Sequence, residues 1–154
     1  MSVISVKELE EIVDGVWMTV LELPVIATDT PSVDTMEYLT SSVRISGAWH
    51  GTIKLKASRD FFTLAAAKVF TKEANEVVSQ DHIDVATELT NMLGGTVKTL
   101  LPEVCDLSLP ALVDERPAGP ALLESATAWV HLISDGHPLA VAIVEESVGI
   151  HEAA

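Results

Sequence analysis

The chain contains 154 residues with a mass of 16.5 kDa, and 48% of its residues are apolar. A chain of this size and composition can bury a hydrophobic core, which excludes a disordered protein and predicts one domain over residues 1–154. The net charge of -14 at pH 7 excludes long-range attraction to a nucleic-acid backbone or to an anionic membrane surface.

The first predicted element is a helix over about residues 6–21. Ser5 followed by Glu8 forms the pattern of a capping box, in which each side chain accepts a hydrogen bond from the backbone of the other residue. Apolar residues then recur at steps of three and four positions, at Leu9, Ile12, Val13, Val16, Trp17 and Val20. Pro24 ends the helical pattern.

A hairpin of two strands is predicted next. Val43 and Ile45 indicate the first strand, and the alternation of apolar and polar residues over 52–57 indicates the second. Residues 47–51, which contain two glycines, are placed to form the turn between them.

Two helices follow the hairpin. Ser58 is placed to cap the first one, whose apolar residues are Phe61, Phe62, Leu64, Ala65 and Val69. After residues 79–81, a second helical pattern runs from about residue 82 to residue 101.

Beyond Pro102 the pattern returns to strands, over residues 107–109, 126–133 and 139–145. The Asp135-Gly136 pair favours a tight hairpin between the last two, and the proline- and glycine-rich residues 115–120 are expected to form a loop. This order predicts an α+β fold, with a largely antiparallel sheet and two long amphipathic helices on it.

The last predicted strand contains a continuous apolar run over residues 139–144, with no charge before Glu145. We expect this segment to lie at an edge of the sheet, where it would be open to pairing with a second copy of the chain. The alternative is that a neighbouring strand or a helix covers it, which would make it a central strand.

The helix over residues 82–101 separates its residues into two sides. The apolar side contains Val85, Leu89, Met92, Leu93, Val97 and Leu100. The opposite side is a polar stripe of Asp84, Glu88, Asn91, Gly95 and Lys98. Glu88 and Asn91 stand at positions i and i+3, so their side chains are neighbours that can address adjacent atoms of a partner.

Gly94 and Gly95 interrupt this helix with two residues that each cost about 1 kcal/mol relative to alanine. A helix surface without side chains beside Asn91 would let the backbone of another protein approach closely. The alternative is that Gly94 ends a shorter helix.

Residues 84–99 resemble the signature helix of the CheC/CheX/FliY family of chemotaxis phosphatases. In that family an acidic or seryl residue, a glutamate and an asparagine recur at the offsets of Asp84, Glu88 and Asn91. The resemblance extends more loosely from about Val43 to the final strand, although Pro110 stands a few residues earlier than the family pattern places its proline. The first helix has no asparagine after its glutamates, which favours the single-site CheX type.

The resemblance implies a phosphatase that hydrolyses the aspartyl phosphate of a CheY-like response regulator. Asn91 would then orient the attacking water, and Glu88 would dock to a lysine of the regulator. Asp84 is expected to support docking or the start of the helix, and Gly94, Gly95 and Lys98 are expected to contact the partner. This chain would bind no cofactor, because the regulator carries the Mg²⁺, and it would form a homodimer.

Two other functions remain open from the residues. The first is a CheC-like docking module without phosphatase activity. The second is a small-molecule enzyme, for which Asp84 and Glu88 lack a third titratable partner. Without the family match, Asp84, Glu88 and Lys98 would be interpreted as a solvated helix surface.

The remaining residues indicate no metal site and no membrane segment. The five histidines are too scattered for zinc-ligand spacing, and Cys105 is expected to be a buried side chain without a disulfide. No apolar stretch reaches the about 20 residues of a spanning helix, and the first residues lack the order of a secretion signal. We therefore expect a cytoplasmic protein.

Overall fold

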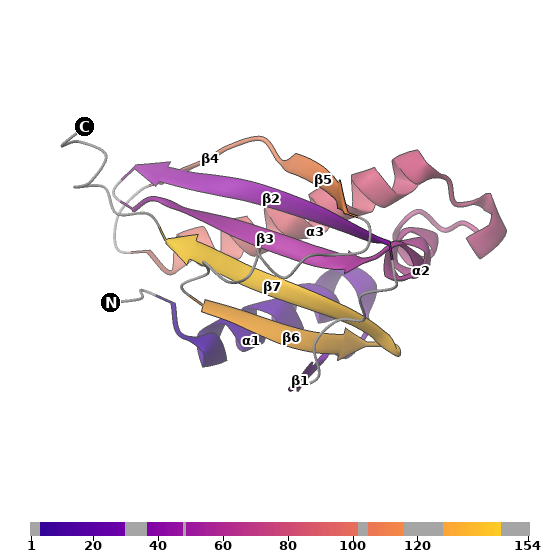
Figure 1. Ribbon diagram of the computed structural model, residues 1–154, viewed down its shortest axis with the longest axis horizontal. Coiled ribbons are helices and arrows are strands. Elements are labelled where there is room, and N and C mark those ends of the chain that lie inside the picture. The colour runs from indigo at the N-terminus through magenta and orange to yellow at the C-terminus, as the bar shows by residue number, and fades with distance from the viewer. Residues whose placement is uncertain (1–3, 30–36, 48, 102–104, 116–127, 146–154) are drawn as a thin grey trace.

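The computed structural model describes residues 4–29, 37–47, 49–101, 105–115 and 128–145 (Figure 1). Its helical elements are α1 (Val6–Val16), a π-helical turn η1 (Trp17–Leu21), α2 (Arg59–Val69), a short 3-10 turn η2 (Ala74–Glu76) and α3 (Ser79–Thr99). Its strands are β1 (Ile26–Thr28), β2 (Tyr38–Gly47), β3 (Gly51–Ser58), β4 (Cys105–Leu107), β5 (Ala111–Glu115), β6 (Ala128–Ser134) and β7 (His137–Glu145).

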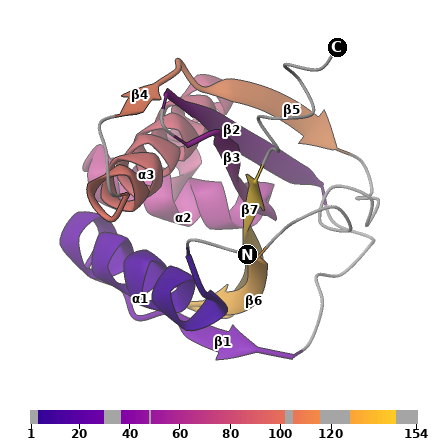
Figure 2. The same cartoon turned by 90° about the vertical axis from the view of Figure 1, so that its left-hand side faces the viewer.

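All described strands join one sheet of seven strands in the order β1-β6-β7-β3-β2-β4, with β5 also paired to β2. Every pairing is antiparallel. The three α-helices lie on the same side of this sheet (Figure 2). The expected α+β fold with a largely antiparallel sheet is therefore confirmed.

The expectation that the last strand forms an edge of the sheet is wrong. β7 lies between β3 and β6 and is paired on both sides, with Leu55 and Val130 both opposite Val141. The apolar run agrees with this central position, because residues 139–143 are all buried.

The first helix agrees closely with the prediction from the sequence. Ser5 caps α1, its hydroxyl accepts a hydrogen bond from the backbone of Glu8, and the Glu8 carboxylate accepts one from the backbone of Ser5. The helical path continues through η1 to Leu21 and ends at Glu22, which takes the left-handed conformation with a φ of 55°. The predicted range of residues 6–21 is thus confirmed, with its last turn widened to a π-helix.

The two predicted hairpins are also confirmed. β2 and β3 pair through Val43 opposite Ile53, and β6 and β7 pair across a turn at Asp135 and Gly136. Both turn residues have positive φ, 48° and 80°, which is why an aspartate and a glycine stand there.

Strands β1 and β5 were not predicted, and several of the predicted strands differ in their bounds. The segment predicted at residues 107–109 is β4 over Cys105–Leu107, and Cys105 is buried as expected. In the predicted loop over residues 115–120, Glu115 ends β5, and the other residues lie outside the described ranges. The strand predicted to begin at residue 126 is described from Ala128.

The hydrophobic core lies between the sheet and the helices. It combines the inward residues of the strands, such as Leu39, Ile53 and Val141, with the buried sides of the helices, such as Phe61 and Leu89. α1 packs mainly on β6, whereas α3 packs mainly on β2 and β3, so the two helices lie side by side over different parts of the sheet. In the part of the chain that the structure describes, no helix combines the length and the apolar character needed to cross a membrane.

Candidate functional site

The site helix α3 is continuous from Ser79 to Thr99, three residues longer at its start than predicted. It passes through Gly94 without a break, so the alternative in which this glycine ends a shorter helix is wrong. Core packing explains this, because buried apolar residues precede and follow the two glycines: Val85, Leu89, Leu93 and Val97. This packing offsets the low helix propensity of glycine.

The polar stripe predicted from the sequence lies away from the core. Asp84 and Glu88 are exposed, and Asn91, Gly95 and Lys98 are half-buried. Asp84 accepts a hydrogen bond of 2.9 Å from the side chain of Gln80, one turn earlier on the same helix. The structure therefore places these five residues together on one face of α3.

Glu88 and Asn91 are free to contact another molecule. Among the residues that the structure describes, neither side chain takes part in a hydrogen bond or an ion pair. A carboxylate offers only acceptors, and a carboxamide offers both a donor and an acceptor. The two neighbouring side chains thus present complementary hydrogen-bonding groups to a partner.

The two glycines of α3 lie in different surroundings, which corrects the expectation that both contact a partner. Gly94 is buried, and a Cβ on it would come to 2.8 Å from Val43 Cγ1 and 3.1 Å from Leu107 Cδ1. A Cβ on Gly95 would meet nothing within 4 Å. Gly94 therefore permits the close packing of α3 on the sheet, and only Gly95 belongs to the exposed stripe.

The start of α3 is fixed by Asp81, which the sequence analysis did not single out. Its carboxylate accepts hydrogen bonds from the backbone N–H of Val78 at 3.0 Å and from Lys72 Nζ at 2.9 Å. The bond from the Val78 backbone, followed by the Lys72 contact, lowers the pKa of Asp81 below its ordinary value. The sequence signals this capping role only through the position of Asp81, an acidic residue three positions after the N-cap residue Val78.

His82 ties α3 to α2. Arg59 Nη1 lies 3.1 Å from His82 Nδ1, and because arginine carries only donors, this nitrogen of the ring must accept. The ring proton is therefore on Nε2, which donates to Thr63 Oγ1 at 2.8 Å. Thr63 in turn donates its hydroxyl proton to the backbone carbonyl of Arg59 at 3.2 Å. Burial, followed by the charge of Arg59, lowers the pKa of His82 and keeps the ring neutral.

Among the described residues, Glu88 and Asn91 line neither of two hollows that lie beside the helices. The larger, about 430 Å³, is a groove between α1 and α3. The smaller, about 260 Å³, lies between α1, β1 and β6 and includes His131. The exposed stripe lies on the outer face of α3, where it is accessible to the surface of another protein.

The structure offers no metal centre in the ranges it describes, where no three side chains of His, Cys, Asp or Glu gather closely enough to hold an ion. Near the start of the same helix, Asp81 is engaged with Lys72, and His82 is engaged with Arg59. Within the described ranges, the stripe residues whose side chains make no hydrogen bond or ion pair are thus Glu88, Asn91 and Lys98, which offer a carboxylate, a carboxamide and an ammonium group.

The comparison with protein families gives a match to the model of chemotaxis phosphatase CheX over residues 39–131, which include Asp84, Glu88 and Asn91. No curated protein sequence matches the chain.

Several solved structures share the fold, and three of them are as follows. The chemotaxis protein CheX of Vibrio vulnificus is 16% identical, with a TM-score of 0.75, over 92% of this chain and 95% of that one. A CheC-like superfamily protein of Shewanella sp. PV-4 is 16% identical, with a TM-score of 0.72, over 96% and 100% of the two chains. The CheX–CheY–BeF3–Mg²⁺ complex of Borrelia burgdorferi contains a chain that is 16% identical, with a TM-score of 0.69, over 95% and 100%.

Proposed function

This chain belongs to the chemotaxis phosphatase CheX family, and we propose that it hydrolyses the aspartyl phosphate of a CheY-like response regulator. The observation that carries this proposal is the pair of Glu88 and Asn91. Both lie on the outer face of a rigidly packed helix, and neither is engaged within the described part of the chain. The printed description of one similar structure, a complex of CheX with CheY, supports a regulator of that kind as the partner.

Asn91 is proposed to orient the attacking water. Phosphoryl transfer is accelerated mainly by placing the nucleophile in line and by neutralising the charge on the phosphoryl oxygens. A carboxamide can accept a hydrogen bond from the water and donate one to a neighbouring oxygen, as a glutamine does in GTPases. The half-buried position of Asn91 restricts its rotation, which lowers the entropy lost when the water is placed.

Glu88 is proposed to set the register of docking. Its exposed carboxylate, one helical turn before Asn91, would form an ion pair with the lysine that we expect beside the phosphorylation site of the regulator. Such a pair fixes the rotation of α3 in the foreign pocket and thereby the position of the Asn91 amide. The Mg²⁺ would come with the regulator as part of the substrate.

The rest of the stripe is proposed to contact the regulator surface. Gly95 leaves open space one turn after Asn91, so a backbone segment of the partner can approach the helix there. Asp84 and Lys98 mark the two ends of the stripe and would contact charged groups at the rim of the interface. We also propose a homodimer, as the family resemblance implies, in which each copy presents its own Glu88 and Asn91.

Dephosphorylation of a purified phosphorylated regulator tests the proposal. The cognate CheY-like regulator is phosphorylated, and the loss of its phosphoaspartate is followed with and without this protein. We expect a faster loss, in proportion to the concentration of the protein. Binding of the phosphorylated regulator without faster hydrolysis would instead assign the chain to the docking modules of the fold.

A further inference from the structure

The groove between α1 and α3 is an apolar trough with an acidic wall. Its volume is about 430 Å³, and its lining includes Ile12 and Val16 from α1 and Met92 from α3. Glu8 and Glu11 stand along the α1 wall. A surface of this kind, apolar at its floor and charged at its rim, is typical of contact with another protein.

The groove adjoins the proposed site directly. Met92 follows Asn91 in the chain and stands one turn after Glu88, so its Cβ lies about 5–6 Å from that of Glu88 on the helix surface. Thr96 lies one turn further along the same wall, and its hydroxyl is already bonded to the backbone carbonyl of Met92 at 2.9 Å. A protein bound at the stripe would therefore lie next to this wall of the groove.

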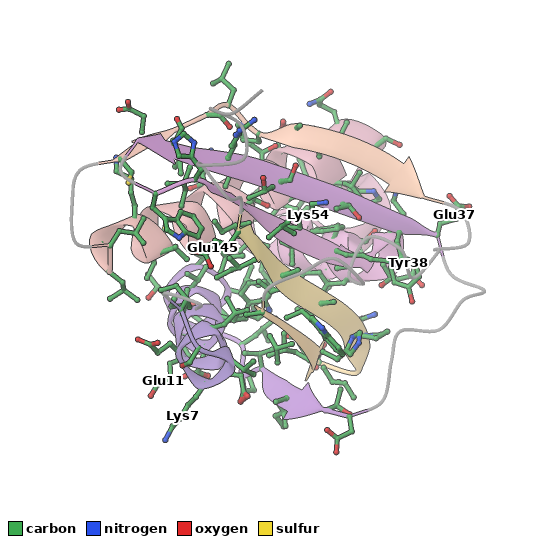
Figure 3. All side chains as sticks on the ribbon, turned by 60° about the vertical axis from the view of Figure 1, so that its left-hand side comes forward. Lys7, Glu11, Glu37, Tyr38, Lys54 and Glu145 are labelled. Atoms are coloured by element: carbon green, nitrogen blue, oxygen red, sulfur yellow. The ribbon has the colours of Figure 1, made fainter. Side chains whose placement is uncertain are left out.

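The charge of the groove determines which charge the bound segment should carry. The Glu8 carboxylate accepts a hydrogen bond from the Ser5 backbone, whereas Glu11 makes no hydrogen bond or ion pair with the described residues. Glu11 points outward from α1, as does Lys7 (Figure 3). With acids on its wall, in a chain whose net charge is -14, the groove attracts a cationic segment.

Gly15 keeps the groove open. It stands in the last turn of α1, and a Cβ added to it would meet nothing within 4 Å. Gly15 also lines the groove, so a larger side chain at this position would extend into the groove without a clash with its surroundings.

We propose that this groove receives a basic and partly apolar segment of the response regulator, beside the contact made by Glu88 and Asn91. The inference rests on the proposed function. A second contact next to the catalytic pair would add to the orientation that the Glu88 ion pair gives the regulator on α3. Part of the binding free energy would then come from α1, which carries no residue of the proposed chemistry.

Two measurements test the groove. The dissociation constant is measured with a regulator activated by beryllofluoride and Mg²⁺, and the saturated hydrolysis rate is measured separately with the phosphorylated regulator. Glu11→Lys is expected to raise the dissociation constant about five- to tenfold at low salt, while the matched control Asp14→Lys, an exposed α1 residue outside the groove, changes it less than about twofold. Gly15→Leu is expected to raise it to a similar degree without lowering the melting temperature. The saturated rate should stay unchanged in all three variants.

Each outcome decides one of the two proposals. If Glu11→Lys and Asp14→Lys weaken binding equally, or if Gly15→Leu binds as the wild type does, the groove is not a docking surface, and hydrolysis by the wild type still supports the proposed function. If the groove variants weaken binding but the wild type hydrolyses nothing, docking stands and the phosphatase activity fails. If the activated regulator does not bind at all, both proposals are overturned.

Discussion

Gly94 of the site helix faces Val43 of β2 so closely that a Cβ on the glycine would stand 2.8 Å from the valine Cγ1. Valine is β-branched and cannot easily turn its methyl group away. The distance between α3 and the sheet is therefore set by the absence of a side chain at Gly94, and this distance fixes where Glu88 and Asn91 stand.

Alanine at the two glycines should change stability in opposite directions. Gly94→Ala should lower the free energy of unfolding by about 1 kcal/mol, because a clash of about 1–3 kcal/mol outweighs the gain in helix propensity. Gly95→Ala meets open space and should raise it by about 0.5–1 kcal/mol. Urea unfolding of both variants measures the difference, and a rise in both would contradict the packing described for Gly94.

Asn91→Ala should remove most of the rate acceleration while leaving regulator binding nearly intact. The amide acts on the water in the transition state, so its loss should lower the saturated rate by at least about tenfold. Single-turnover decay of the phosphorylated regulator at saturating protein gives this rate. Gln80→Ala, which removes an exposed amide from the same helix, is the control, and retention of more than about half of the wild-type rate by Asn91→Ala would exclude water placement by that residue.

Glu88→Ala should weaken productive docking instead. The carboxylate contact to the regulator exists before the transition state as well as within it, so its loss should raise the half-saturating regulator concentration. The rate should then recover in part as the regulator concentration increases. An unchanged half-saturating concentration with a lower maximum rate would show that Glu88 acts in the chemical step.

The hydrogen bonds of His82 predict a loss of stability on acidification. The folded protein holds the ring neutral with a pKa below 6.5, so in mild acid the unfolded chain binds a proton that the folded chain does not. Well above pH 6.5 the ring is neutral in both the folded and the unfolded chain, so His82 adds no pH dependence there. The free energy of unfolding falls as the pH decreases through 6.5. Unfolding curves of the wild type and of His82→Gln should converge as the pH falls from about 8 to about 5. Parallel curves would contradict the lowered pKa of His82 in the folded protein.

The proposed homodimer predicts twice the mass of one 16.5 kDa chain in sedimentation equilibrium at micromolar concentration. β7 cannot supply the contact, because both of its edges are already paired within the sheet. A mass near that of one chain over the whole accessible concentration range would reject the dimer and leave the proposed hydrolysis untouched.

The helices and the hairpins could be predicted because their signals are local. The capping box of Ser5 and Glu8 and the turn at Asp135 and Gly136 depend on residues within a few positions of each other. β1 and β5 could not be found in this way, because three and five residues are too few to show a period.

The place of β7 in the sheet could not be predicted for a different reason. Its apolar run fits a central strand as well as an unprotected edge, and the choice depends on β3, whose residues lie far away in the sequence. Likewise, the exposed stripe of α3 followed from helical periodicity, whereas the role of Gly94 depends on Val43 of β2, which no pattern within the helix reveals.

The central position of β7 also determines when the molecule can fold during its synthesis. β3 is made early, yet its partner β7 follows only after α2, α3 and three further strands have been made. Until then the apolar side of α3 has only part of a sheet to pack on, and one long edge of β3 is unpaired. Until β7 is made, this unpaired edge is exposed to aggregation. Folding of the sheet therefore depends on contacts between segments that are distant in the sequence. A chain truncated before His137 would contain Glu88 and Asn91 but would lack β7, the strand that completes the sheet under α3.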